Sequence, residues 1–127
     1  MGSEKIIVIN VLASHYSDDC HIKGTLAVPL DKLEAFVEPL PRDTQIVVYC
    51  AHYQCPKSEE AWRLLKRLGF TNCYAYEGGM REWCQKNYPT EGACQLSYLK
   101  EESRKPMREK TDIRTITAEA LKALLKL

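Results

Sequence analysis

Several features that would place this 127-residue chain in a familiar class are absent from it. No apolar run approaches the roughly 20 residues that a membrane-spanning helix needs, so no membrane segment is expected. Its 18 Lys and Arg nearly balance its 17 Asp and Glu, giving a net charge of +1. This balance excludes a broad electrostatic attraction to nucleic acid or to an anionic membrane. The first residues lack the layout of a signal peptide, so we expect a cytoplasmic protein.

The cysteines and histidines do not form a recognisable metal site. The six cysteines contain no Cys-x-x-Cys pair, and the three histidines have no ligand spacing with them. We therefore expect no metal, and no cofactor is indicated. In a chain of this size without an export signal, reduced thiols are expected rather than disulfides. The cysteines interpreted as core or surface thiols are Cys20, Cys73, Cys84 and Cys94.

The chain does contain short apolar runs that alternate with amphipathic segments. Because β-branched runs bounded by turn residues are typical of buried strands, we expect strands at 5–11, 26–29, 45–49 and 72–76. Apolar residues at helical spacing predict helices at 31–40, 58–68 and 80–87, and residues 13–23 are expected to form a loop. This alternation predicts an α/β fold with a central, mainly parallel sheet and helices on both faces.

Cys50 stands where one of these strands ends, and a loop separates it from a helix that we expect to begin with Ser58 as its N-cap. A helix N-terminus lowers the pKa of a nearby thiol, and the thiolate is the reactive form. Backbone N–H groups there can also hold an anionic substrate. Cys50 is therefore the candidate catalytic residue. The candidate substrate-binding residues of the loop are Ala51, His52, Tyr53, Gln54, Cys55, Lys57 and Ser58.

Within this loop several roles stay open. Cys55 is a candidate resolving thiol that could form a disulfide with Cys50, or a passive loop residue. His52 and Lys57 could face an anionic donor, or simply be solvated. No arginine occurs between Cys50 and Ser58. This argues against a phosphatase or arsenate reductase, because that chemistry needs an arginine to clamp the tetrahedral anion.

Four segments resemble, in order, the rhodanese-like (sulfurtransferase) domain family. IIVINV resembles its first core strand, CHIKGTLAVP resembles its GHIPGAxNxP segment, and VVYC resembles the strand that carries its catalytic cysteine. LLKRLGFTNCYAYEGGMREW resembles its LxxxGFxNVxxLxGGxxxW signature. The similarity covers roughly residues 5–88. It implies a rhodanese-like fold with Cys50 as the catalytic residue.

The resemblance also implies a reaction. The Cys50 thiolate would take the outer sulfur of a donor such as thiosulfate or a persulfide, and the resulting persulfide would pass it to an acceptor. That acceptor would be a thiol, a cyanide-like molecule or a protein. Two departures from the family are visible: Asn10 and Leu12 stand where the family has Asp-x-Arg, and the active loop is about two residues longer. They leave open a non-catalytic or redox-sensing module that uses Cys50 and Cys55.

The last third of the chain has a different character. Residues 1–90 are expected to form the rhodanese-like core, with the active-site loop at 50–58, and residues 91–112 a charged linker. Residues 113–127 predict a helix, with Thr117 as N-cap and Leu121, Leu124 and Leu125 on one face.

This helical segment resembles the family's usual N-terminal lead-in, which this chain lacks at its start. We therefore hypothesise a circularly permuted domain, in which the helix docks on the core and Leu127 lies close to Met1. A truncated tandem domain and domain swapping are the alternatives. The oligomeric state is not predicted.

Overall fold

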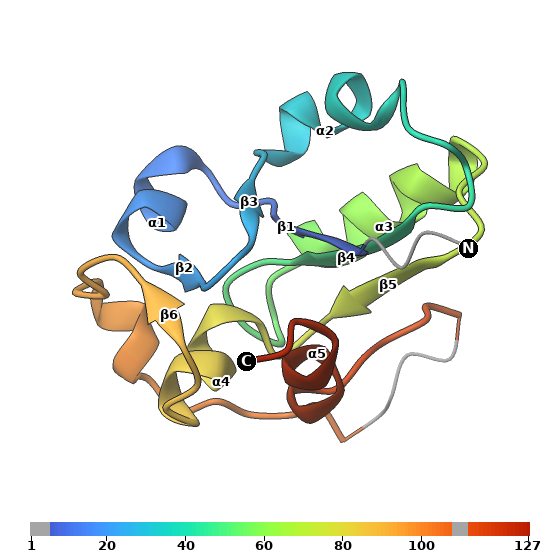
Figure 1. Ribbon diagram of the computed structural model, residues 1–127. Helices are drawn as coiled ribbons and strands as arrows, with labels where there is room; N and C mark the ends of the chain where they lie inside the picture. Colours follow the sequence, from blue (N-terminus) through green and yellow to red (C-terminus); the bar gives the residue numbers. More distant parts are fainter. Residues whose placement is uncertain (1–5, 108–111) are drawn as a thin grey trace.

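The computed structural model describes residues 6–107 and 112–127, and its centre is a parallel sheet (Figure 1). The strands are β1 (Ile6–Asn10), β3 (Leu26–Ala27), β4 (Gln45–Tyr49) and β5 (Cys73–Tyr76), in the order β3-β1-β4-β5. All three pairings are parallel. The four predicted strands are confirmed. Most residues of β1 and β4 are buried because helices cover both faces of the sheet, which explains their uninterrupted apolar sequences.

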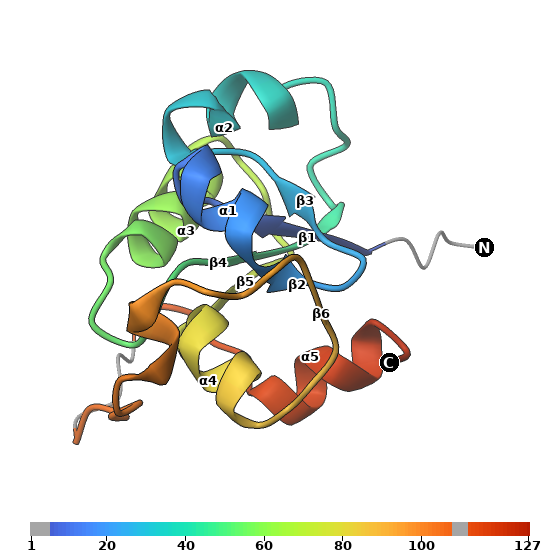
Figure 2. The same ribbon diagram turned by 90° about the vertical axis from the view of Figure 1, so that its left-hand side faces the viewer.

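Helices lie on both faces of the sheet (Figures 1 and 2). On one face, α2 (Leu30–Val37) and α3 (Lys57–Arg67) pack Leu33 and Leu65 against Val48. On the other face, α4 (Gly79–Gln85) and α5 (Ala118–Leu124) pack Trp83 and Leu121 against Tyr49 and its neighbours. The predicted α/β class is therefore confirmed. No helix in the described ranges is long and apolar enough to cross a membrane.

The loop predicted at 13–23 is wrong. This stretch forms α1 (Ser14–Asp19) and β2 (His21–Ile22), and β2 pairs antiparallel with β6 (Thr90–Glu91). The only buried residue of α1 is Ser17, so the helix has no apolar stripe that the sequence pattern could show.

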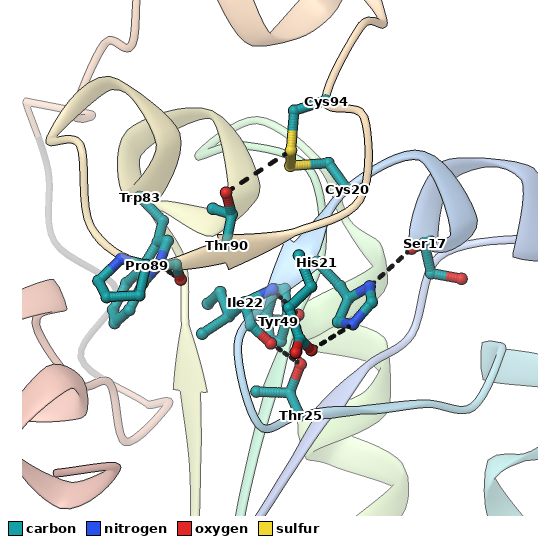
Figure 3. Close-up of polar contacts among 11 residues, drawn as sticks. Ser17, Cys20, His21, Ile22, Thr25, Tyr49, Trp83, Pro89, Thr90 and Cys94 are labelled. Carbon is teal, nitrogen blue, oxygen red and sulfur yellow. Dashed lines mark hydrogen bonds and ion pairs between the residues drawn. A yellow bond between two sulfur atoms is a disulfide. The ribbon is translucent and has the colours of Figure 1, made fainter. Parts of the chain in front are cut away.

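A buried hydrogen-bond network joins β2 to the main sheet (Figure 3). The hydroxyl of Tyr49 accepts the Ile22 N–H at 3.0 Å. Thr25 donates to the Ile22 carbonyl at 2.7 Å, so the Tyr49 hydroxyl must donate its own proton to Thr25 at 2.9 Å. Burial raises the pKa of Tyr49 to about 12. This network thus fixes Tyr49, the last residue of β4, directly before Cys50.

A disulfide corrects the interpretation of two cysteines. Cys20 and Cys94 are bonded, with an S–S distance of 2.11 Å and a Cα–Cα distance of 4.5 Å (Figure 3). The prediction that both are free thiols is wrong because the fold brings together residues 74 apart in the sequence. Cys73 and Cys84 are free, as predicted. Disulfides are typical of oxidising compartments, so the cytoplasmic location stays a prediction.

The charged linker predicted at 91–112 begins too early. Besides β6 and Cys94, residues up to the short 3₁₀ helix η1 (Ser97–Lys100) belong to the packed domain, and Leu99 is only 3% exposed. Arg81 of α4 is buried and donates to the Tyr98 carbonyl at 2.8 Å, which fastens this segment to the core. Residues 101–107 are largely exposed, and 108–111 lie outside the described residues.

The C-terminal segment extends the core. Thr115 forms a parallel bridge with Ala75 of β5, and the Thr117 hydroxyl accepts the Ala120 N–H at 3.1 Å. The predicted N-cap is therefore confirmed. Leu121 is fully buried, whereas Leu124 is 36% exposed, so the predicted three-leucine face is only partly correct. Met1 lies outside the described residues, and the permutation stays a proposal together with its alternatives.

Candidate active site

Cys50 follows β4 directly and is completely buried. Its carbonyl accepts the Met80 N–H, and the Ala51 carbonyl accepts the Arg81 N–H, each at 2.9 Å. The first turn of α4 therefore holds the base of the loop. Gly79 makes this approach possible: its φ is +65°, and a Cβ there would lie 2.5 Å from the Cys50 carbonyl oxygen.

The middle of the loop is fastened by its own side chains. Tyr53 donates to Glu82 of α4 at 2.6 Å, and Gln54 donates to the Arg104 carbonyl at 2.9 Å. The Nδ1 atom of His52 accepts the Gln54 N–H at 3.1 Å, so this ring nitrogen carries no proton. An anion could meet only the other nitrogen of that ring. These predicted substrate-binding residues therefore act first as supports for the loop.

Ser58 is not the helix cap that the sequence predicts. Helix α3 begins at Lys57, after Pro56 in the N-cap position, and Ser58 is buried inside the first turn. Its hydroxyl donates to Glu77 at 2.9 Å, and both side chains are buried. A hydroxyl has one proton, so only the backbone N–H of Ser58 is left to donate to a Cys50 thiolate.

Cys50 and Cys55 lie close together but have very different surroundings. Cys50 is buried, whereas Cys55 is partly exposed. The Cys50 thiol donates a hydrogen bond to the Cys55 carbonyl oxygen at 3.6 Å. Donation of its proton toward Cys55, together with burial, raises the pKa of Cys50 well above its ordinary value. The same hydrogen bond lowers the pKa of Cys55 to about 6.

The structure thus reverses the order of acidity expected from the sequence. Two thiols that share a hydrogen bond titrate as a pair, and the first negative charge settles where it is best solvated. Here that place is Cys55, because Cys50 has lost contact with water. An ionised Cys50, as the sequence predicts, is therefore disfavoured in the reduced pair, because its interaction with Cys55 and its burial both raise its pKa.

The backbone amides of the loop are divided between two tasks. The Gln54 and Cys55 N–H groups bond to His52 and so face the loop itself. Those of Ala51 and Lys57 bond to the Cys55 sulfur and favour its thiolate. The anion-binding position that the sequence predicts for a donor is therefore held by a sulfur atom of the protein.

A cavity of about 240 Å³ lies beside the loop, between α4 and the C-terminal segment. Tyr53 and Glu82 form part of its wall, and Tyr76 donates to Glu82 at 2.7 Å. Lys86 and Glu119 also line it and form an ion pair at 3.0 Å. The cavity gives small molecules space next to the loop.

Sequence reasoning missed Glu77, Arg81 and Glu82. A signal for Glu77 was available, because it follows β5 just as Cys50 follows β4, and neighbouring parallel strands end at the same edge. No comparable signal marks Arg81 or Glu82. Residues 6–107 and 112–127 contain no group of three or more His, Cys, Asp or Glu that could hold a metal ion.

Comparison with known proteins shows the same fold in several solved structures. The BH2092 protein from Bacillus halodurans is 26% identical, with a TM-score of 0.64 over 80% of this chain and 72% of that one. The Rhodanese_3-like domain of the Alr3790 protein from Anabaena sp. is 29% identical, with a TM-score of 0.60 over 68% of this chain and 99% of that one.

A relative in sequence is the "Putative sulfur carrier protein YrkF" of Bacillus subtilis (strain 168), which is 28% identical over 85 residues. The match covers 67% of this chain and 45% of the relative, so the chain spans less than half of that protein's length. The model of the family described as the rhodanese-like domain matches residues 3–86. Since this match spans well over half of the sequence, the chain belongs to the rhodanese-like domain family.

Proposed function

We propose that this protein is a sulfurtransferase that moves a sulfane sulfur from a donor to a thiophilic acceptor, through a persulfide in the loop 50–58. The observation that carries the proposal is the pair of thiols after β4, Cys50 and Cys55, joined by the hydrogen bond from the Cys50 thiol to the Cys55 carbonyl oxygen at 3.6 Å. The pKa of Cys55 is lowered to about 6 in this pair, and a thiolate is the nucleophile that attacks an outer sulfur. The family membership and the sulfur-carrier relative support the same chemistry.

The loop favours a donor with little negative charge. Lys57 is the only Lys or Arg between Cys50 and Ser58. The amides of Ala51 and Lys57 already hold a sulfur of the protein. Few hydrogen-bond donors of the loop therefore remain to hold the two negative charges of thiosulfate. A low-molecular-weight persulfide needs fewer of them. The acceptor would be a thiol, a cyanide-like molecule or a protein acceptor in the cytoplasm.

The test is sulfur transfer by the full chain from thiosulfate and from glutathione persulfide, to cyanide and to a thiol. The double variant Cys50→Ser/Cys55→Ser should lose transfer completely. Cys84→Ser is the matched control, because it removes a free, half-buried thiol of α4. Transfer that survives in the double variant would exclude the loop as the site.

A redox-sensing module is the second candidate, because the same thiol pair can close to a disulfide. The contact between Cys50 and the Cys55 backbone at 3.6 Å favours it. The two functions differ in one result. A sensor would show a reversible Cys50–Cys55 bond by mass spectrometry but no sulfur uptake from either donor.

A further inference from the structure

We propose that the cavity beside the active-site loop binds a small aminothiol as the sulfur acceptor, with the ammonium group of this molecule against the carboxylate of Glu82. The proposal rests on the proposed sulfur transfer, for which it names the class of acceptor. The cavity has a volume of about 240 Å³ and lies between α4 and the segment that carries α5, which Figures 1 and 2 show side by side. Pockets for drug-sized ligands are larger, at about 300–1,000 Å³, so this one suits a smaller molecule.

The carboxylate of Glu82 is held in the cavity wall by two phenols. One of its oxygens accepts the Tyr53 hydroxyl at 2.6 Å, and the other accepts the Tyr76 hydroxyl at 2.7 Å. Burial and the neighbouring Glu82 raise the pKa of both tyrosines, so the phenols keep their protons and donate them. Two neutral donors fix the carboxylate in place without neutralising its charge.

No cationic side chain in the described part of the chain forms an ion pair with Glu82. Lys86 of the cavity wall is paired with Glu119 at 3.0 Å, and Lys105, the other lysine of the wall, is exposed to solvent. A carboxylate has about four lone-pair positions, and the phenols occupy two of them, so others remain for a ligand. An ammonium group brings three donors and the opposite charge, and such charge-assisted hydrogen bonds are about twice as strong as neutral ones.

The site is rigid and partly apolar. The Glu82 carboxylate lies directly against the backbone of Gly78, where a Cβ would collide with it. Pro106, Ile116 and Ala118 supply apolar surface to the same cavity, and the methylene groups of a small ligand can pack there. Because the carboxylate is already fixed, a ligand does not have to order it on binding.

The cavity touches the active-site loop at two points. Tyr53 belongs to the loop and forms part of the cavity wall. Glu77 also lines the cavity and accepts the hydroxyl of Ser58, at the other end of the loop, at 2.9 Å. A thiol held in the cavity by its ammonium group therefore lies beside the loop that would carry the persulfide. Holding two reactants next to each other in this way accelerates the reaction between them.

The acceptor step balances without a further reactant. The sulfur of the aminothiol bonds to the outer sulfur of the loop persulfide, and the bond between that outer sulfur and the protein cysteine breaks. The cysteine leaves with the electron pair of the broken bond and takes the proton that the acceptor thiol gives up. The protein returns to its reduced thiol and the aminothiol departs as a persulfide, so the sulfane sulfur is passed on without net oxidation or reduction.

The test separates loading of the protein with sulfur from its discharge. The reduced full chain is loaded with glutathione persulfide, the excess is removed, and a thiol is added. Mass spectrometry of the intact protein then follows the loss of one sulfur atom. Cysteamine and 2-mercaptoethanol are a matched pair, because an ammonium group replaces a hydroxyl at the same position, and 3-mercaptopropionate carries the opposite charge. Half-maximal discharge should need the lowest concentration of cysteamine and the highest concentration of 3-mercaptopropionate.

Glu82→Gln keeps the shape of the side chain and removes its charge. It should raise the half-saturating concentration of cysteamine, relative to that of 2-mercaptoethanol, by about tenfold, which is the usual worth of a hydrogen bond to a charged group. This ratio is the readout because a disturbed loop would affect both thiols alike. Glu34→Gln is the matched control and should keep the ratio of wild type, because it makes the same change at an exposed position of α2, on the other face of the sheet.

A binding measurement on wild type needs neither a variant nor turnover. Ethanolamine, which lacks the thiol, should shift the backbone amide NMR signals of Gly78 and Glu82, and ethylene glycol should not. The proposal is overturned if ethanolamine shifts neither signal, if ethylene glycol shifts them equally, or if Glu82→Gln leaves the ratio unchanged. A wild-type protein that loads no sulfur would reject the proposed function and the acceptor role with it. Normal loading with an unchanged ratio would reject only the aminothiol.

Discussion

Replacement of Leu121 by alanine tests whether the C-terminal helix is part of the domain. Leu121 is fully buried in a cluster that contains Val8, Val47, Tyr76 and Trp83. Buried Leu→Ala changes cost about 2–5 kcal/mol, and we take about 3 kcal/mol because a terminal helix can partly close the cavity. The expected loss lies within the ~5–15 kcal/mol stability of an ordinary domain, so the variant should still fold.

The assay is thermal unfolding followed by far-UV circular dichroism. Unfolding entropy of about 2.1 cal/mol/K per residue corresponds to roughly 0.27 kcal/mol/K for this chain length, so about 3 kcal/mol lowers Tm by about 11 °C. Leu124→Ala is the matched control on the same helix, because Leu124 is 36% exposed. It should cost less than about 1 kcal/mol. Equal shifts for the two variants would refute the reasoning and show that α5 is not packed as a core element.

Three further outcomes are expected. Cys94→Ser should lower the free energy of unfolding by about 2–4 kcal/mol, because the bond to Cys20 closes a long loop. A reductant should lower the Tm of wild type equally. A Tm that the reductant leaves unchanged would contradict the disulfide. Tyr49→Phe should cost about 1–3 kcal/mol in urea unfolding, since a buried N–H loses its acceptor; a change below about 0.5 kcal/mol would argue against that network. Gly79→Ala should abolish sulfur transfer, because its Cβ would lie 2.5 Å from the Cys50 carbonyl; full activity would show that the loop can move away.

The main elements of the fold could be predicted from the sequence because their signals are local. Strand 45–49 is a run of β-branched residues, and Thr117 stands three residues before the N–H that it caps. Helix α1 escaped prediction because its buried residue is a serine. The packed stretch before the linker was also missed, since Tyr98 is held to the core by Arg81, a charged residue of α4.

For the candidate site too, some features could be predicted from the sequence and others could not. The location of Cys50 at a strand end before a helix followed from the sequence, and so did the loop residues around it. The roles of Tyr53 and Ser58 did not follow, because their partners are Glu82 and Glu77. These carboxylates lie beyond the loop in the sequence and reach it only when β5 and α4 pack beside β4.

The sequence by itself determined the family, the α/β class and the loop in which the chemistry is placed. The reason is that apolar periodicity and turn glycines are patterns among residues only a few positions apart. Only the tertiary structure decided that Cys20 is bonded to Cys94, and that the pKa of Cys50 is raised while that of Cys55 is lowered. The reason is that acidity depends on burial and on the directions of backbone N–H groups. Both are properties of the packed chain, not of neighbouring residues.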